Sequence, residues 1–439
     1  MTGGMARIVL YVLVVTLPVW LASWLGGEPE GVVIDVGRNF GLIGFMILTL
    51  QFLLAARVKW IERAFGFDIL IRFHRLIALA AAALLILHPL LLAYGGMGWN
   101  LLIGLDLPWS IWAGKAALIL VVANVALSRF QTRIGLSFER WRLGHGLLAP
   151  AILVLIAVHS WFAGDDLEAL PLQALWVGLI LLAASMFVFH RFVRPIRLRK
   201  QAYTVRDVRQ ETGDVWTVEL APPEGQNVPD YLPGQFHFLT FFRDPALPVE
   251  EHHWTISSSP ARKDALSSTI KSVGDFTSTV GQTRPGDSAA VHGPFGRFSY
   301  LVHPEERDLV FLIGGIGITP IMSMLRHMRD TGDDRSVVLL YANRRQDQIV
   351  FRRELDEMAA GGAPNLKLVH VLSRPEDGWT GERGYIDRTL IEKHCGQDPA
   401  GKVFYVCGPA RMAEALVSAL LSMGVRERMI RREIFSFLD

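Results

Sequence analysis

The sequence predicts a multidomain membrane protein in which a bundle of six transmembrane helices precedes an antiparallel β-barrel and a doubly wound α/β domain. Its 439 residues are 51% hydrophobic and 20% charged, with a mean hydropathy of +0.31, which is too apolar for a wholly soluble chain of this length. Nearly all long apolar runs lie before residue 194, and the glycine-rich and acidic patterns lie after it. We expect domains at 1–200, 201–303 and 304–439.

Charge and cysteine content exclude several classes of protein. The net charge of +2, from 44 basic and 42 acidic residues, does not suggest a nucleic-acid partner. The two cysteines, Cys395 and Cys407, form no CxxC motif. This excludes disulfide scaffolds, zinc ribbons and cysteine-ligated iron–sulfur clusters. A metal centre would therefore have to use histidine.

Six apolar runs are long enough to cross a bilayer core of about 30 Å, which takes about 20 residues. The first could instead be a signal peptide, but it continues through Trp20 and Trp24 and has no small-x-small cleavage site. The runs lie at 8–25, 40–56, 71–94, 108–128, 143–163 and 171–193.

Basic residues predict the orientation of the spans. They gather after the second, fourth and sixth runs, whereas the alternate loops carry acidic residues and a single base, Arg38. Short loops rich in lysine and arginine stay in the cytoplasm. We therefore expect a multi-pass protein of a bacterial-type inner membrane, with both termini cytoplasmic. The basic residues include Arg57, Lys59, Arg63, Arg129, Arg133, Arg140, Arg191, Arg194, Arg197 and Lys200.

Five of the 13 histidines fall in the apolar runs, and four of them share one spacing. His74 and His88 lie in the third run, and His145 and His159 in the fifth. Fourteen residues of helix return to within about 40° of the same face and climb about 21 Å. Because the two runs cross in the same direction, we expect His74 to face His145 at the inner level and His88 to face His159 at the outer level.

Such pairs suit axial ligation of two haem irons by neutral imidazole. Gly144, Gly146 and the alanines between 78 and 83 would let a macrocycle approach the backbone. Membrane histidines can also bond across helices or line a proton path. A di-metal site is disfavoured because no carboxylate lies mid-span nearby. His190 has no partner at this spacing and suits the membrane interface.

Lys115 lies about two turns into the fourth run, at the expected depth of His88 and His159. A lysine at this depth could neutralise a haem propionate or attract an anion or oxygen species. It could equally snorkel to the outer surface. Arg38 has the same two interpretations.

After residue 200 the pattern becomes that of a soluble protein. Short alternating segments such as 203–208 and 215–220 predict a small antiparallel barrel. From about residue 308, strand–turn–helix units predict a parallel sheet. Two turns follow strands and could hold a diphosphate at a helix N-terminus, although each could also be a simple tight connection. Their residues are Gly314, Gly315, Gly317, Thr319 and Pro320 in the first turn, and Cys407, Gly408 and Pro409 in the second.

The barrel segment contains two further candidate stretches, 252–258 and 271–277. An aromatic ring beside hydroxyl groups can stack on a flavin and hydrogen-bond it. A cation beside a glycine turn can hold a diphosphate. Taken alone, both stretches could be ordinary barrel sequence.

These residues resemble the ferric reductase and NADPH oxidase superfamily along essentially the whole chain. The family's flavin motif reads roughly HPFT, and HHWT stands here at 252–255. The resemblance implies that His252 and Trp254 contact FAD, with Trp254 stacking and Thr255 bonding the N5 side. The stretch like the family's GDWT assigns Lys271, Gly274 and Thr277 to the diphosphate. GPFG, GGIGITP and CGP match at 293–296, 314–320 and 407–409.

Two further assignments concern the nicotinamide substrate. In the family a C-terminal aromatic covers the flavin, which points to Phe435 or Phe437, with Phe435 fitting the E-x-F ending better. Packing of a last strand is the alternative role of this segment. Arg344 and Arg345 follow the strand after the glycine turn, where arginine suits a 2′-phosphate. They favour NADPH, with NADH possible.

The resemblance implies a flavohaem oxidoreductase for transmembrane electron transport. NADPH would reduce FAD, and single electrons would pass through two b haems to an acceptor outside. We expect O2, giving superoxide, as in an NADPH oxidase. The alternatives are a ferric chelate, a periplasmic protein or, without redox chemistry, a transporter with a nucleotide-gated domain. We expect the lipid membrane to surround the helices, and no obligate protein partner is evident.

Overall fold

The computed structural model describes residues 2–25, 30–163, 165–396, 399 and 401–433. By internal contacts the chain forms two compact units, residues 1–194 and 195–439. The division falls close to the compositional change near residue 194, and the three domain boundaries drawn from the sequence stay predictions.

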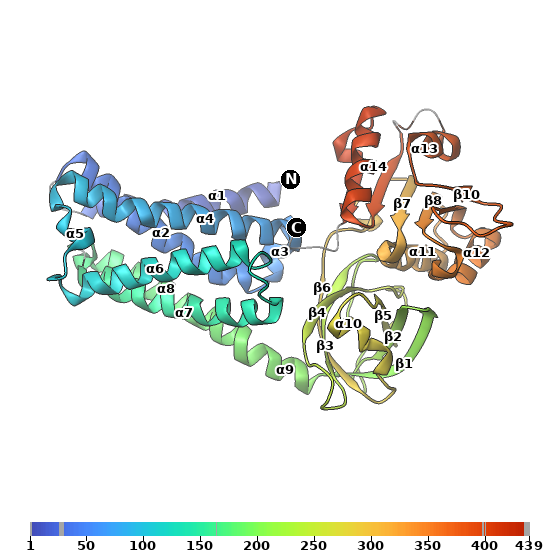
Figure 1. The fold of residues 1–439 in the computed structure, drawn as a ribbon, viewed down its shortest axis with the longest axis horizontal. Coiled ribbons are helices and arrows are strands. Elements are labelled where there is room, and N and C mark those ends of the chain that lie inside the picture. Colours follow the sequence, from blue (N-terminus) through green and yellow to red (C-terminus); the bar gives the residue numbers. More distant parts are fainter. Residues whose placement is uncertain (1, 26–29, 164, 397–398, 400, 434–439) are drawn as a thin grey trace. The chain divides into compact units, whose positions relative to one another are not determined.

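The first unit contains six helices that are long and apolar enough to cross a membrane within its described part (Figure 1). This confirms the predicted helical bundle. Short helices α3 (Lys59–Phe65), α5 (Asn100–Ile103) and α9 (Arg194–Lys200) lie between or after them. The long helices are α1 (Thr2–Leu25), α2 (Val32–Ala55), α4 (Phe67–Leu92), α6 (Trp109–Phe130), α7 (Phe138–Ala163) and α8 (Leu170–Val188).

The core of the bundle is small, as expected for helices that face lipid. Phe45 stacks on Trp176, with ring centroids 4.3 Å apart. The indole N–H of Trp176 donates to Ser160 Oγ at 2.9 Å. Many large apolar side chains point outward, among them Trp24, which is 83% exposed. In a bilayer such side chains contact acyl chains instead of water.

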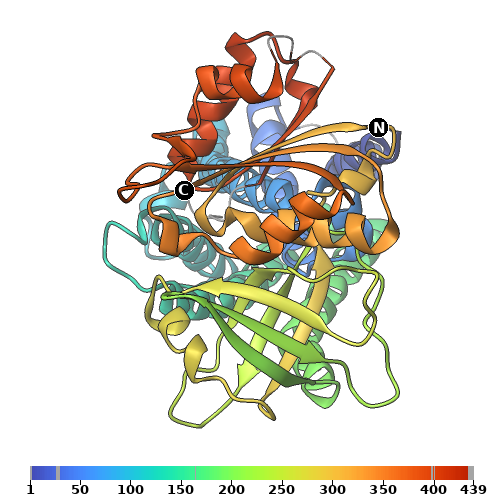
Figure 2. The ribbon, with the colours of Figure 1, turned by 90° about the vertical axis from the view of Figure 1, so that its right-hand side faces the viewer.

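The second unit begins with a six-stranded antiparallel sheet in the order β4-β3-β6-β1-β2-β5. Figure 2 shows these strands, coloured green to yellow, curving around one interior. A bridge between Ile256 and Ser268 joins the two ends of the sheet and closes the predicted barrel. The strands are β1 (Tyr203–Thr212), β2 (Val215–Ala221), β3 (Phe236–Phe242), β4 (Glu251–Thr255), β5 (Leu266–Lys271) and β6 (Ser288–Phe295).

A parallel six-stranded sheet follows in the order β10-β9-β8-β7-β11-β12. Helices α11 (Ile318–Thr331) and α12 (Arg352–Gly361) pack on one face. Helices α13 (Arg388–Cys395) and α14 (Ala410–Ser422) pack on the other, which gives the predicted doubly wound fold. The strand order reverses between β7 and β11, where such sheets bind ligands. The strands are β7 (Asp308–Gly314), β8 (Ser336–Asn343), β9 (Asn365–Leu372), β10 (Glu382–Arg383), β11 (Val403–Cys407) and β12 (Ile430–Glu433).

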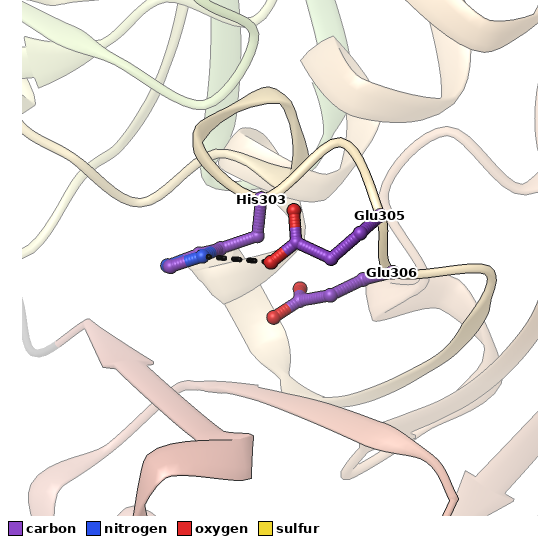
Figure 3. Close-up of side chains that lie close together, drawn as sticks. All are labelled: His303, Glu305 and Glu306. Carbon is purple, nitrogen blue, oxygen red and sulfur yellow. Dashed lines mark ion pairs between the residues drawn. The ribbon is translucent and has the colours of Figure 1, made fainter.

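An ionic clamp fixes the loop that enters the parallel sheet (Figure 3). Here His303 Nδ1 lies 3.5 Å from the carboxylate of Glu305. The neighbouring Glu306 accepts from the Tyr405 hydroxyl at 3.1 Å and from the Arg431 guanidinium at 2.7 Å. Because Glu306 already serves strands β11 and β12, this cluster of metal-ligand residue types is a structural clamp.

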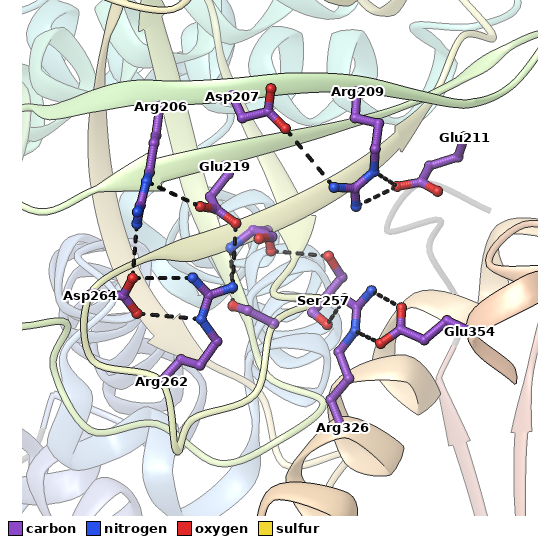
Figure 4. A network of polar contacts seen from close by, with 12 residues as sticks. Arg206, Asp207, Arg209, Glu211, Glu219, Ser257, Arg262, Asp264, Arg326 and Glu354 are labelled. Carbon is purple, nitrogen blue, oxygen red and sulfur yellow. Dashed lines mark hydrogen bonds and ion pairs between the residues drawn. The ribbon is translucent and has the colours of Figure 1, made fainter. Parts of the chain in front are cut away.

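A second network joins the barrel to helices α11 and α12 (Figure 4). Arg326 donates to the carboxylate of Glu354 at 2.6 and 2.9 Å and to the Ser257 carbonyl at 2.7 Å. The Ser323 hydroxyl donates to the Ser258 carbonyl at 2.7 Å. Burial opposes the charge of Glu354, but the hydrogen bonds and the charge of Arg326 outweigh it and lower the Glu354 pKa. The segment that follows HHWT is thereby fixed to the parallel sheet.

Candidate functional site

The four histidines of the predicted pairs lie on two helices, α4 and α7, and meet as the spacing predicts. The ring centroids of His74 and His145 are 6.3 Å apart, with the planes at 71°. Those of His88 and His159 are 6.4 Å apart, with the planes at 72°. Two equivalent imidazole pairs therefore lie 14 residues apart along the same two helices.

These separations fit a metal ion between the rings better than a direct hydrogen bond. A metal–imidazole bond of about 2.0–2.1 Å, plus about 1.1 Å from ring nitrogen to centroid, places two axial imidazole centroids about 6.3 Å apart. A direct N–H···N bond of about 2.9 Å would place them about 5.1 Å apart. The donor set and its spacing thus fit a bis-histidine iron.

Backbone carbonyls orient the outer pair. His88 Nδ1 lies 2.8 Å from the Gly37 carbonyl of α2, and His159 Nδ1 lies 2.9 Å from the Ser110 carbonyl of α6. A carbonyl can only accept, so each Nδ1 carries the proton. This tautomer leaves the Nε2 lone pair of each ring available to a metal.

The inner pair is held differently. His145 Nδ1 lies 3.0 Å from the side-chain oxygen of Asn124, and the ring stacks on Trp141 at 5.3 Å. Gln51 donates to the backbone carbonyl of His74 at 3.2 Å. His74 Nδ1 is buried and has no hydrogen-bond partner among the described residues. Sequence reasoning did not identify Asn124, Trp141 or Gln51.

The small residues proposed to admit a macrocycle differ in their surroundings. A side chain added at Gly144 or Gly146 would meet no atom within 4 Å, so the backbone beside His145 is open. By contrast, Ala81 and Ala82 are buried in the packing of the bundle. Ala80 and Ala83 are exposed, so small residues of α4 as well as the glycines of α7 leave open surface on the two histidine-bearing helices.

Lys115 lies on α6 directly after Gly114, whose backbone contacts His159. Its ammonium group donates to the Gly104 carbonyl at 3.2 Å and lies 4.7 Å from the Trp112 ring centroid. The cation is therefore held on the outer-histidine side of the bundle by a loop carbonyl and an aromatic face.

The HHWT segment is on strand β4. The Trp254 side chain is half-buried, and its indole nitrogen has no hydrogen-bond partner in the described part of the chain. Thr255 is buried. The His252 ring lies 4.2 Å from the Phe276 ring, and His252 Nε2 is 2.8 Å from the Glu250 carboxylate. The Trp254 ring also packs against the apolar core of the barrel, so the flavin-stacking role that the resemblance implies stays a prediction.

The residues assigned to a diphosphate lie at the end of strand β5 and in the turn and short helix that follow it. The Thr277 hydroxyl accepts from the backbone N–H groups of Val273 and Gly274 at 2.9 and 2.8 Å. It thus closes the turn before the short helix α10 (Asp275–Ser278). The Lys271 ammonium lies 3.3 Å from the Asp214 carboxylate.

The two glycine turns meet at the switch point of the parallel sheet. A Cβ on Gly317 would lie 2.5 Å from the Cys407 carbonyl oxygen, and one on Gly408 would lie 3.1 Å from the Gly314 nitrogen. Gly315 has a φ of +53°, a conformation that favours glycine. These contacts require glycine where the turns face one another, and they leave the N-terminus of α11 beside the shared edge.

Several neighbours fix these turns. The Thr319 hydroxyl donates to the Ile316 carbonyl at 3.1 Å, and Pro320 is buried in the first turn of α11. Pro409 packs against Gly314. Tyr341, which no sequence pattern singled out, donates from its hydroxyl to the Gly315 carbonyl at 3.1 Å.

The candidate 2′-phosphate residues are exposed at the end of β8. Arg345 forms an ion pair with Asp347, which raises the pKa of Arg345. The carbonyl of Arg344 accepts from the Arg374 backbone at 2.8 Å, and its side chain is exposed.

Phe435 and Phe437 lie outside the described residues.

Comparison with known families gives matches in both units. Residues 40–156 match the family described as ferric reductase like transmembrane component, and residues 311–418 match the oxidoreductase NAD-binding domain. A ferric reductase like transmembrane match followed by an oxidoreductase NAD-binding match agrees with the resemblance on which the sequence prediction rests. The described part of the chain therefore combines six helices long and apolar enough to cross a membrane with a match to an oxidoreductase NAD-binding domain.

Curated relatives match part of the chain. It is 37% identical over 166 residues to the nitrate reductase (NADPH) of Emericella nidulans, covering 35% of this chain and 19% of that protein. It is 32% identical over 152 residues to the NADH-cytochrome b5 reductase 1 of Lodderomyces elongisporus, covering 34% and 50%. The chain thus spans no more than half the length of these two relatives.

Among solved structures, the flavohem-like FAD/NAD binding domain of the Vibrio cholerae nitric oxide dioxygenase has a TM-score of 0.48 and 23% identity. The match covers 53% of this chain and 98% of that one.

Proposed function

We propose that this protein moves electrons across the membrane from cytoplasmic NADPH to O2 on the outer side, where superoxide forms. The path would use FAD in the barrel unit and two b haems between α4 and α7. Bound flavin would take a hydride and give up electrons singly, and the haems would carry them through the bilayer.

The observation that carries the proposal is the pair of imidazole separations, 6.3 and 6.4 Å. Each fits a metal with two axial histidines, and the pairs lie about 21 Å apart along the helices. His74 and His145 would hold the inner haem, and His88 and His159 the outer. If these four histidines hold the two irons, neither iron would keep an open site, and an acceptor would take its electron at the haem edge.

The residues near the outer pair favour a small anionic product. Lys115 lies on α6, the helix that contacts His159, so its ammonium group would attract an oxygen species or balance a propionate. The match to the ferric reductase like transmembrane family also favours a second acceptor, a ferric chelate.

On the nucleotide side, the glycine turns of 314–317 and 407–409 would hold the NADPH diphosphate at the N-terminus of α11. Arg344 is the better candidate for the 2′-phosphate because Arg345 is paired with Asp347. The flavin would lie against Trp254 and Thr255, with its diphosphate near Lys271, Gly274 and Thr277.

Orientation and domain limits belong to the same proposal. Basic loops support an inner-membrane protein with both termini in the cytoplasm. The domain limits would be 1–200 for the haem domain, 201–303 for the FAD domain and 304–439 for the NADPH domain.

The test is an assay of the purified full-length protein, supplied with haem and FAD. NADPH-driven reduction of cytochrome c is measured with and without superoxide dismutase, beside reduction of a ferric chelate. We expect dismutase to suppress most cytochrome c reduction. Dismutase-insensitive reduction with fast chelate reduction would support the ferric reductase alternative. Protein without a Soret band that shifts on dithionite addition would contradict electron transfer through haem.

A further inference from the structure

The outer histidines share a repeated contact that the inner histidines lack. On α2, the Gly37 carbonyl accepts from His88, and Gly41, four residues later, lies against the same ring. On α6, the Ser110 carbonyl accepts from His159, and Gly114, again four residues later, lies against that ring. Two different helices thus contact two different histidines through the same arrangement, a backbone carbonyl followed four residues later by a glycine.

Helix geometry explains the spacing. In an α-helix the N–H of residue i+4 points to the carbonyl of residue i, so the side chain at i+4 flanks that carbonyl. A carbonyl oxygen has two lone pairs and can accept a second hydrogen bond from outside the helix. The outside donor reaches it only where the i+4 position leaves room.

The contact distances show how little room there is. A Cβ on Gly41 would lie 2.9 Å from His88 Nδ1 and 3.0 Å from its Cε1. A Cβ on Gly114 would lie 2.6 and 2.7 Å from the same atoms of His159. Any side chain at either position would displace the imidazole from its carbonyl.

The inner pair has no such arrangement. His145 bonds the flexible side chain of Asn124, and the buried His74 Nδ1 has no partner among the described residues. Backbone carbonyls therefore hold both outer rings, whereas of the inner rings only that of His145 is held by a hydrogen bond, to a side chain, among the residues that the structure describes.

We infer that Gly41 and Gly114 are positioning residues for the outer haem ligands. By leaving the Gly37 and Ser110 carbonyls open, they fix the plane of each imidazole and keep its proton on Nδ1. A bonded Nδ1–H makes the imidazole a stronger metal donor. The inference rests on the proposed function, because it assigns these glycines to the outer of two haems.

The test compares Gly41→Ala and Gly114→Ala with Gly178→Ala in the full-length protein. Gly178 lies mid-helix in α8, and a Cβ there would meet no atom within 4 Å, so it is the matched control. Haem content per protein is measured, together with a redox titration followed at the Soret band. Each haem should give one reduction step in this titration, and the steps of the outer and inner haem are called the outer and inner wave. His88→Ala identifies the outer wave by removing it, and Asn124→Ala should alter the inner wave.

We expect Gly114→Ala to lose about one haem of two or to displace the outer wave, with the inner wave unchanged. Gly41→Ala should act in the same direction but less, since its contact is longer. The inference is overturned if both waves keep their potentials in both variants, or if the haems are lost together while Gly178→Ala retains them. Parent protein that binds no haem would instead overturn the proposed function.

Discussion

His237 shows how one buried titratable residue can link the stability of the barrel to pH. The side chain is fully buried in the barrel, with Nε2 at 2.6 Å from the Ser268 hydroxyl. Burial lowers the pKa of His237 to about 3. The ring is therefore neutral in the folded protein at any pH above this value, whereas in the unfolded chain it takes up a proton near pH 6.5.

The folding contribution of neutral His237 is present in full above about pH 6.5 and is lost as the pH falls toward 3, by up to about 1.4 kcal/mol per pH unit. We predict that His237→Gln flattens the pH dependence of barrel unfolding between pH 7 and 4.5. Thermal unfolding of the full-length protein, followed by flavin release, measures it. Equal slopes in the parent protein and in His237→Gln would refute the assignment.

At the residue scale, the sequence predicted which histidines meet but not what holds them. The spacing of 14 between His74 and His88 places both on one helix face, because helix periodicity is fixed. The acceptors Gly37, Ser110 and Asn124 come from other helices, and their choice depends on how those helices are rotated. A sequence signal for the two outer contacts is a pair of small residues four apart, Gly37 and Gly41 in α2 and Ser110 and Gly114 in α6.

At the scale of elements, the contact between the two glycine turns should be intolerant of any side chain. A Cβ on Gly317 would meet the backbone of Cys407 and Gly408, at 2.5 to 2.9 Å. Backbone on both sides cannot yield, so we predict that Gly317→Ala lowers kcat/KM for NADPH by about tenfold or more, equivalent to about 1.4 kcal/mol. Haem content should not change.

The assay is NADPH-driven ferricyanide reduction by the full-length protein. Gly361→Ala is the control, because Gly361 is helical and a Cβ there would meet no atom within 4 Å. A kcat/KM for NADPH in Gly317→Ala equal to that of the parent protein would show that the two turns can move apart without loss of activity.

The Arg326–Glu354 pair should contribute to the docking of the barrel on the parallel sheet. The side chains are 12% and 28% exposed, and Arg326 also bonds the Ser257 carbonyl. We predict that Arg326→Ala destabilises the protein by about 1.5–3 kcal/mol, since a charged hydrogen-bond network is broken in a partly buried place. The loss should appear as a lower melting temperature and faster flavin release.

The exposed pair Arg353 and Glu357 in α12, the helix that carries Glu354, provides the control. Surface ion pairs contribute about 0–1 kcal/mol, so Arg353→Ala should have little effect. A similar loss of stability in both variants would mean that the network at Arg326 does not hold the barrel to the parallel sheet.

Element boundaries were harder to predict than element types. The second span was expected from residue 40, but α2 begins at Val32. Arg38 had interrupted the apolar run, and in the structure it pairs with Glu30 at 2.7 Å, so the helix continues past the charge. The strand–turn–helix pattern predicted a parallel sheet. Its strand order came only from the structure, because long-range pairing has no local signal.

At the scale of the whole molecule, the uneven distribution of apolar residues predicted a membrane unit joined to a soluble one. The structure divides the chain between Arg194 and Pro195, close to that compositional change. Hydropathy and glycine patterns reveal such a division because bilayer and water impose different compositions. The proposed electron acceptor leaves no such pattern, since transfer at a haem edge would require no dedicated binding residue.

The most direct test of the central claim is the haem-to-protein ratio of the purified full-length chain, measured together with its electron paramagnetic resonance spectrum. The four histidines and their 6.3 and 6.4 Å separations predict two b haems per chain, both low-spin with two axial imidazoles. Replacement of His88 or His145 by alanine should each remove about one haem of two. A parent protein with fewer than two haems, or with high-spin iron, would contradict the account.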